Sequence, residues 1–290
     1  MEYHSDRYQD YSLLVYKDKK LVALLPANYS DDAIYSHQGL TYGGLIVDKQ
    51  SSFNTILESF KNCLVYLNKN GFKTLLLKLI PEIYLTYPSS EMNYLLFVID
   101  AKLHKREISS TIYTQNKLSI QQNRIQGKRK GKKYNLIIKE EESFDTFWNE
   151  ILIPNLSKKY NTDPTHSLKE ISLLKSRFPR NIRQFNVYYK NEVVAGATIF
   201  ETRTVAHTQY ISANNDKQKL GSLDYLFEYL INVTFKDKMY FDFGTSNQNS
   251  GKQINKGLQF WKEGFGARGI VHDFYKVDLK NVKKLETVFV

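Results

Sequence analysis

Asp242 and Lys262 belong to residue types that can carry the transfer of an acyl group to an amine. Both lie in the glycine-punctuated stretch 239–277, where we predict a strand, a loop, a short amphipathic helix and a second strand. If the loop folds back, the Asp242 carboxylate could accept a proton from an amine, and the Lys262 ammonium could stabilise an oxyanion. Two structural alternatives stay open: a salt bridge between the two side chains, and a Lys262 ammonium at a solvated rim.

Two histidines, His37 and His207, lie in similar strand-like segments and are candidate general bases. Histidine suits this role because its ordinary pKa lies near neutrality. The alternative is a strand histidine whose ring is hydrogen-bonded to a neighbouring carbonyl. The spacing of the remaining histidines does not suggest metal ligands, and we expect no metal site; they are His4, His104, His166 and His272.

The loop 214–222, NNDKQKLGS, separates a predicted strand from a predicted helix. A glycine at a helix start leaves backbone amides open, and together with the helix dipole these attract a pyrophosphate. The loop resembles the pyrophosphate loop of N-acetyltransferases in one glutamine, one glycine and one serine. We therefore expect four residues to bind the phosphate of a donor: Gln218, Lys219, Gly221 and Ser222. Ser222 could instead serve only as a helix cap.

The segment 115–133 is polar and basic, and we predict that it is helical up to Gly131. Its cations could bind phosphate or a polyanion; they are Arg124, Lys128, Arg129, Lys130, Lys132 and Lys133. Aromatic residues that could stack on bases are not interleaved with them. We therefore interpret the segment as a helical connector with a solvated face rather than as a nucleic-acid-binding element.

Composition sets the broad class of the chain. The 290 residues are 42% apolar, and the formal net charge is +11, which favours partners that carry phosphate or carboxylate. The single cysteine, Cys63, fits a reducing compartment. No signal peptide or membrane-spanning stretch is recognisable, so we expect a cytoplasmic protein. Because strand-like sequence begins after only ten polar residues, we also expect that a longer version could carry a further N-terminal segment.

The chain contains an internal repeat. A hairpin (11–25), a strand (33–47), a helix (52–69) and a buried strand (74–80) recur in the same order at 184–200, 205–213, 222–235 and 239–244. Four equivalent pairs lie between 167 and 172 residues apart: Val22 and Val194, His37 and His207, Phe53 and Leu223, and Phe72 and Met239. The pattern predicts two copies of one α/β unit with a mixed sheet, packed around a shared cleft.

The repeat also predicts the domain boundaries. We expect an N-terminal domain over residues 1–114, which could lack its first helices, the connector over 115–133, and a C-terminal domain over 134–290. Residues 93–100 read as a further strand of the first copy, and 143–159 and 167–178 as helices of the second. Only the second copy carries the glycine-rich stretch with Lys262, so it is the better candidate for chemistry.

The segments VVAGATIF, HTQYISANN, LGSLDYLFEYLI, YFDFG and GLQFWKEGFGA together resemble the FemAB-like branch of the GNAT (Gcn5-related N-acetyltransferase) superfamily. The resemblance runs from about residue 11 to 277. It implies two tandem GNAT-type domains and transfer of an acyl or aminoacyl group to an amine, from acyl-CoA or from aminoacyl-tRNA. It also implies a transition-state role for Lys262, which follows an aromatic residue as in the family. The sequence shows no heptad-patterned helical pair like that of the tRNA-dependent members, so the donor stays open.

We therefore expect an acyl- or aminoacyltransferase acting on the amine of an anionic, cell-envelope or nucleotide-linked precursor, which could also be lipid-linked. The expected catalytic residues are Lys262, Asp242 and Tyr210. The expected substrate-binding residues are His37, Tyr42, His207, Asn214, Asn247 and Trp261. The alternative is a non-catalytic module that binds an anionic ligand or partner, and tRNA is a further candidate partner. The sequence leaves the oligomeric state open.

Overall fold

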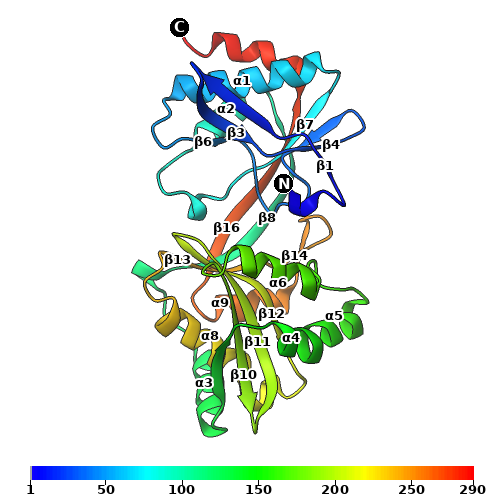
Figure 1. Cartoon of the computed structure of the whole chain (residues 1–290). Helices are drawn as coiled ribbons and strands as arrows, with labels where there is room; N and C mark the ends of the chain where they lie inside the picture. The colour runs from blue at the N-terminus through cyan, green and yellow to red at the C-terminus, as the bar shows by residue number, and fades with distance from the viewer. Residues whose placement is uncertain (1) are drawn as a thin grey trace. The chain divides into compact units, whose positions relative to one another are not determined.

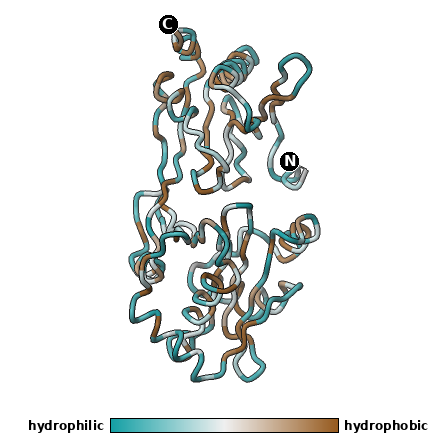
Figure 2. The backbone as a smooth tube through the Cα atoms, turned by 90° about the vertical axis from the view of Figure 1, so that its left-hand side faces the viewer, coloured by the Kyte–Doolittle hydropathy of each residue, from teal (hydrophilic) through white to brown (hydrophobic). Residues whose placement is uncertain are grey.

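The computed structural model describes residues 2–290, without the side chains of Glu2 and Tyr160, and the chain divides into two compact units (Figure 1). Unit 1 comprises the chain up to Glu107 together with Asn249–Lys252 and Val271–Val290. Unit 2 comprises Ile108–Gln248 and Gln253–Ile270. Apolar residues follow the strands inside each unit, and hydrophilic residues follow many of the turns (Figure 2).

Unit 1 is built on two sheets and two main helices. One sheet has the order β1 (Gln9–Asp10), β4 (Asn28–Ser30), β5 (Ala33–Tyr35), β7 (Thr74–Lys78) and β16 (Arg268–Asp278). The other sheet has the order β2 (Leu13–Lys17), β3 (Lys20–Leu25) and β6 (Ile46–Val47). The helices are α1 (Phe53–Lys69) and α2 (Glu91–Val98), with 3-10 turns η1 (Glu2–His4), η2 (Glu82–Tyr84) and η6 (Leu279–Thr287).

Helix α1 shows why this part of the sequence folds as it does. The Ser52 hydroxyl caps its first turn by accepting a hydrogen bond from the Thr55 amide at 3.2 Å. Its apolar residues recur at helical spacing and form the centre of the core of unit 1; they include Ile56, Leu57, Phe60, Leu64 and Leu67. The helix therefore packs one apolar face into the core of unit 1.

Unit 2 has a six-stranded sheet. Its order is β8 (Lys102–Tyr113), β13 (Tyr240–Thr245), β12 (Val205–Ala213), β11 (Glu192–Glu201), β10 (Ile182–Tyr189) and β9 (Ile137–Glu141), and a small pair is formed by β14 (Asn247–Gln248) and β15 (Gln253–Ile254). Its helical elements are η3 (Thr114–Asn116), α3 (Gln122–Lys133), α4 (Asp145–Phe147), η4 (Trp148–Leu152), α5 (Ile153–Tyr160), α6 (Leu168–Arg177), α7 (Lys217–Leu220), α8 (Ser222–Tyr229), η5 (Leu230–Thr234) and α9 (Lys256–Glu263).

Two apolar clusters pack against this sheet. One contains Leu226, Phe227 and Phe241 and joins the strands to α8 and η5. The other contains Phe147 and Trp148 and joins the strands to the helices between β9 and β10. Among the helices of residues 2–290, none has both the length and the apolar composition that crossing a membrane would need.

The two units repeat one topology, which confirms the predicted pair of mixed α/β units. In unit 1, β5 and β7 are parallel neighbours joined across α1. In unit 2, β12 and β13 are parallel neighbours joined across α8 and η5. Each of these parallel pairs is extended by an antiparallel strand, β16 beside β7 and β8 beside β13.

The domain boundaries differ from those predicted. The strand β8 follows α2 of unit 1 along the chain, yet its second half pairs with β13 of unit 2. The strand β16 follows α9 of unit 2, yet its second half pairs with β7 of unit 1. Residues 108–114 therefore belong to unit 2 and residues 271–290 to unit 1, because the last strand of each repeat is exchanged.

The basic segment is part of unit 2 and not a connector. Helix α3 packs closely on α8 because Gly127 and Gly131 carry no side chain: a Cβ at Gly127 would lie 1.8 Å from Oδ2 of Asp224. Three of its cations have partners in unit 2. Arg124 donates to Asp224 at 2.6 Å, Lys128 pairs with Glu228, and Lys130 donates to the Gln218 carbonyl at 2.9 Å.

One predicted strand of the first copy is wrong, and another, expected with a glycine interruption, is shorter than predicted. Residues 93–100 lie mostly in helix α2, because a short apolar run without alternation fits a helix as well as a strand, and Leu95 and Leu96 pack into the core. The predicted strand 33–47 is reduced to β5 and β6. His37 lies after β5 with a left-handed backbone, φ 59°, so it is not a strand residue.

Candidate active site

A buried carboxylate and a histidine face each other across the parallel pair of unit 2. Asp242 on β13 and His207 on β12 are register partners, and His207 Nδ1 lies 2.7 Å from Asp242 Oδ2. The Asp242 side chain is fully buried, whereas that of His207 is 15% exposed. Because an ionised carboxylate can only accept hydrogen bonds, the proton of this contact lies on Nδ1, and Nε2 is then the basic nitrogen of the ring.

Three further groups hold the Asp242 carboxylate. Thr111 Oγ1 on β8 donates to it at 2.8 Å, Ser109 Oγ on the same strand also donates, and the Gly244 amide donates at 3.2 Å. Burial alone would raise the pKa of Asp242, but the hydrogen bond and charge of His207 and the two hydroxyls hold it well below its usual range. Asp242 therefore stays ionised and is a poor proton acceptor.

Lys262 is buried in the last turn of α9, with 2% of its surface exposed. Its ammonium donates to the backbone carbonyls of Gly244 and Thr245, each at 2.8 Å. These carbonyls belong to a β-bulge, where the pairing of β13 with β8 shifts register and Gly244 has φ 73°. Burial lowers the pKa of Lys262 to about 8, against the opposing charge of Asp242. The solvated-rim alternative is therefore wrong.

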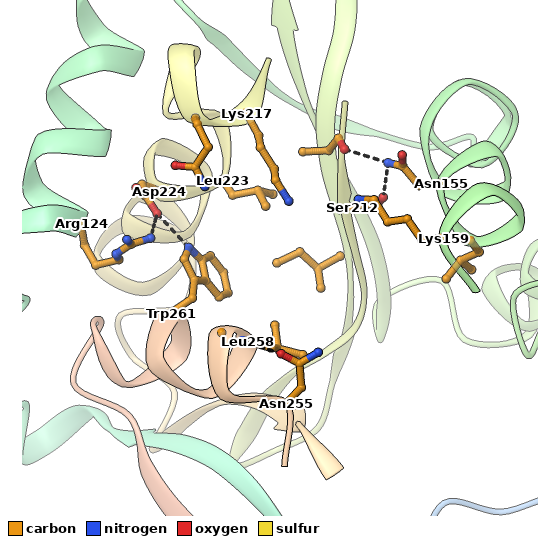
Figure 3. Close-up of a pocket in the computed structure, with 15 residues that line it drawn as sticks. Arg124, Asn155, Lys159, Ser212, Lys217, Leu223, Asp224, Asn255, Leu258 and Trp261 are labelled. Atoms are coloured by element: carbon orange, nitrogen blue, oxygen red, sulfur yellow. Dashed lines mark hydrogen bonds and ion pairs between the residues drawn. The ribbon is translucent and has the colours of Figure 1, made fainter. Parts of the chain in front are cut away.

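A pocket of about 370 Å³ opens beside β12, beyond its ladder with β13. The ladder has three pairs, ending at His207 and Asp242, and β12 then runs on to Ala213. The pocket walls come from β12, α3, α5, α7, α8, α9 and their flanking residues (Figure 3). The residues that line it are Arg124, Asn155, Leu156, Lys159, Ile211, Ser212, Ala213, Lys217, Gln218, Leu223, Asp224, Asn255, Gly257, Leu258 and Trp261.

Charge in this pocket is unevenly divided. The Lys217 side chain extends into it (Figure 3), and its pKa is lowered by burial and by the positive charge of Lys159. On another wall, the Asp224 carboxylate accepts hydrogen bonds from Arg124 at 2.6 Å and from the Trp261 indole at 2.9 Å. Burial raises the pKa of Asp224, although both partners oppose this. An anion beside Lys159 and Lys217 would relieve their mutual repulsion.

The helix start expected to bind a donor phosphate is covered by the chain itself. Gly221 has φ 67°, and a Cβ there would lie 2.1 Å from the Gly127 carbonyl oxygen of α3. Ser222 is fully buried. Lys219 is exposed and does not line the pocket. Of the four residues predicted to bind phosphate, the pocket therefore contains only Gln218.

Tyr210 contacts other residues than Asp242 and Lys262 do. Its hydroxyl lies 2.6 Å from His166 Nδ1 and accepts a hydrogen bond from the His166 amide at 3.0 Å. Its ring packs against Trp148, with centroids 5.0 Å apart, in the cluster next to α4 and α6. Tyr210 therefore anchors the segment before α6 to the sheet.

The predicted substrate-binding residues do not form one cluster. His207 is in the buried pair with Asp242, and Trp261 lines the pocket. Asn214 accepts from the Asp216 amide at 3.0 Å, and Asn247 accepts from the Ile108 amide at 2.8 Å, so both side chains support backbone.

The other two, His37 and Tyr42, belong to unit 1. His37 is buried with its Nδ1 accepting from the Gly39 amide at 3.2 Å, and burial and the charge of His4 lower its pKa to about 4. The Tyr42 ring lies 4.4 Å from that of Tyr84. Neither residue is part of the site in unit 2.

Sequence reasoning missed the residues that complete the site. Ser109 and Thr111 lie in the exchanged strand β8, which follows unit 1 along the chain, so sequence proximity gave no signal for them. Lys159 and Lys217 are single lysines in a lysine-rich chain. The glycines at 127 and 131 did carry a signal, because glycines four residues apart on a helix mark a close helix contact.

Comparisons with known proteins give the fold a name. No family model matches this sequence, and no curated protein does. The crystal structure of FemX matches 98% of this chain and 92% of its own, with a TM-score of 0.68 and 9% sequence identity. The chain has a FemAB-like tandem GNAT fold.

Two more solved structures are similar to this chain. The C-terminal domain of a putative lysylphosphatidylglycerol synthetase from Agrobacterium fabrum is similar over 95% of this chain and 90% of its own, with a TM-score of 0.62 and 11% identity. A tandem GNAT protein from the clavulanic acid biosynthesis pathway is similar over 92% and 82%, with a TM-score of 0.51 and 9% identity. The likeness at these identities is one of fold.

Proposed function

We propose that the protein transfers an acyl or aminoacyl group to an amine and that the chemistry takes place in unit 2. The observation that carries the proposal is the buried pair of His207 and Asp242, which lies with Lys262 where the ladder of β12 and β13 ends. A cationic pocket lies farther along β12, where Ile211, Ser212 and Ala213 line it. The FemAB-like tandem GNAT fold, which acyl- and aminoacyltransferases use, supports the same reaction class.

His207 is the general base of the proposed reaction. Its Nε2 takes a proton from the acceptor amine as the nitrogen attacks the acyl carbonyl, and a C–N bond forms. Asp242 keeps the proton on Nδ1 and stabilises the imidazolium, so its role is positioning rather than the proton acceptance that the sequence suggested. When the intermediate collapses, the bond from the acyl carbon to the donor sulfur or oxygen breaks, and the leaving group takes the proton from His207.

In the proposed reaction, Lys262 stabilises the negative charge that develops on the oxygen of the acyl carbonyl. Within residues 2–290, two acceptors, the carbonyls of Gly244 and Thr245, are hydrogen-bonded to its ammonium, which leaves its third N–H for an oxyanion. The same bonds fix the bulge in the pairing of β13 with β8. Because the pKa is about 8, this ammonium is charged at neutral pH but loses its proton readily above it.

Lys159 and Lys217 hold the donor. Acyl-CoA and aminoacyl-tRNA both carry phosphates, which the two ammonium groups would neutralise, and Trp261 and Leu258 offer an apolar wall. The acceptor is an amine on an anionic precursor, cell-envelope or nucleotide-linked, and the net charge of +11 favours its approach. Because the start of α8 is covered by α3, the pocket rather than Gly221 and Ser222 is the proposed donor site.

The test is product formation with each donor in turn. The full chain is incubated with a nucleotide-linked cell-envelope precursor that bears an amine and with either acetyl-CoA or a pool of aminoacyl-tRNAs, and the acceptor mass is followed. A mass increase by one acyl or aminoacyl group with one donor supports the proposal. Donor binding by calorimetry without any product would contradict it and favour the non-catalytic binding module. With tRNA, binding must weaken steeply as salt rises.

A further inference from the structure

The small sheet of unit 1 has two apolar faces. Residues Leu14, Leu24 and Ile46 are cross-strand partners in one row over β2, β3 and β6, and Tyr16 pairs with Leu21 beside them. Four of these are large apolar side chains that stay open to solvent: Leu14 is 54% exposed, Tyr16 58%, Leu21 45% and Ile46 42%. We call this surface the outer face.

The opposite face of the same sheet is the one that the fold needs. It is formed by residues that alternate with those of the outer face and that belong to or pack against the core of unit 1: Leu13, Val15, Ala23, Leu25 and Val47. An antiparallel sheet that covers a core on one side normally carries polar residues on the other. A contiguous apolar outer face therefore marks a contact surface.

Lysines border the outer face. The turn between β2 and β3 carries Lys17, Lys19 and Lys20, and Lys49 follows β6; all four are exposed. Two aspartates, Asp18 and Asp48, lie among them, so the border is positive on balance. Long lysine side chains can lie along an apolar layer while their ammonium groups reach phosphates above it.

We propose that the outer face docks on an anionic lipid bilayer, independently of the transfer reaction. Leucine and isoleucine side chains would enter the boundary of the acyl chains, and Tyr16 would lie at the headgroup level that tyrosine favours. The turn lysines add attraction to anionic headgroups. A second copy of this chain fits the face less well, because it would bring two sets of lysines together on chains that each carry a net charge of +11.

The experiment is sedimentation of the full chain with vesicles of mixed phosphatidylglycerol and phosphatidylcholine and with vesicles of phosphatidylcholine alone. The protein is expected to sediment with the mixed vesicles, and the bound fraction should fall as the salt concentration rises. Little protein should sediment with the neutral vesicles. Tyr16→Ser should weaken binding to mixed vesicles by about five-fold or more, since a large apolar side chain no longer leaves water. Tyr87→Ser is the matched control, because Tyr87 is 59% exposed elsewhere in unit 1.

A second pair of variants tests the charges. Replacing the three turn lysines by glutamine should weaken binding by about a hundred-fold, at about five-fold for each lysine near an anionic surface. The same change at Arg129, Lys132 and Lys133, exposed cations of α3, should have a much smaller effect. Circular dichroism and unfolding midpoints should be unchanged, because all the substituted side chains are exposed.

Two results would overturn the proposal. One is equal weakening by Tyr16→Ser and Tyr87→Ser, or by the two sets of cation variants. The other is a dimer, seen by light scattering, that Tyr16→Ser dissociates while the wild-type chain does not bind vesicles. Turnover with a water-soluble acceptor should be the same for the wild type and Tyr16→Ser, so failure of docking and failure of the transfer reaction are read separately.

Discussion

Each unit contains a parallel strand pair with a buried or half-buried lysine near its end, but the groups around the two lysines differ. In unit 2, Lys262 binds a bulge beside the pair of His207 and Asp242. In unit 1, Lys78 donates to the carbonyls of His37, Gln38 and Leu40, at 3.3, 3.0 and 2.6 Å. Burial lowers the pKa of both lysines to about 8. The end of the strand pair in unit 1 is thus occupied by its own chain.

The proton-transfer pair is also confined to unit 2. Counted from the first pair of each parallel ladder, the positions of His207 and Asp242 correspond to Tyr35 and Leu76 in unit 1. His37 lies two residues past that position, so it is not the structural counterpart of His207. The repeat therefore preserves the scaffold, whereas the paired histidine and carboxylate belong to unit 2. The two lysines come from different elements, Lys262 from α9 and Lys78 from β7.

The largest expected effect on stability is that of removing the carboxylate at the centre of unit 2. Asp242→Ala leaves the His207 ring, two hydroxyls and a buried amide without their acceptor, and should cost about 3–5 kcal/mol of the free energy of unfolding. Denaturant unfolding measures it. The control is Asp32→Ala in unit 1, where an exposed carboxylate binds the exposed Lys73 and little change is expected. Equal costs would mean that Asp242 is not held as described.

The next effect concerns the helix that connects the two parallel strands, α8 in unit 2 and α1 in unit 1, and the residues that cover it. In unit 2, α3 approaches α8 through glycine, whereas in unit 1 the turn η6 contributes the side chains of Val282 and Leu285 to the core around α1. Gly127→Ala should destabilise the protein by about 1–3 kcal/mol, because the new methyl group overlaps Asp224. Gly257→Ala, which would meet nothing closer than 3.7 Å, should be neutral or slightly stabilising. Thermal unfolding compares the two.

A smaller effect, on donor affinity, is expected for the cations that line the pocket of unit 2. Lys217→Gln should weaken donor binding by about ten-fold, the loss of one charge-assisted contact. Lys219→Gln changes an exposed residue of the same short helix outside the pocket and should leave donor affinity as it is. Calorimetric titration of the donor measures both. If the Lys219 variant binds the donor as weakly as the Lys217 variant, the assignment of the donor phosphate to the pocket is wrong.

The smallest effect concerns the pH dependence of stability that Lys78 and Lys262 cause. Their pKa values are about 8 in the folded chain and near 10.5 when exposed, so between these values the unfolded chain binds more protons and stability rises with pH. Each lysine should contribute about 1 kcal/mol between pH 8 and pH 9. Lys78→Met and Lys262→Met should each remove about half of this rise in urea unfolding at the two pH values. A rise that neither variant alters would show that the lysines are not buried as cations.

The sequence predicted the repeat and the fold class, because hydrophobic periodicity is a local signal. It did not predict which groups surround Lys262. Ser109 and Thr111 reach the site through an exchanged strand, a long-range pairing that periodicity cannot register. The glycine of the loop 214–222 was read as a ligand-binding feature, although helix packing against Gly127 explains it.

The most direct test of the account is the turnover number of two histidine variants with the donor that gives product. His207→Asn keeps a polar group beside Asp242 but removes the base, and kcat should fall by about 10²–10⁴-fold. His37→Asn is the counterpart in unit 1, where asparagine tolerates the left-handed backbone, and it should retain nearly full kcat. Full activity of the His207 variant, or an equal loss in both, would contradict the assignment of the chemistry to unit 2.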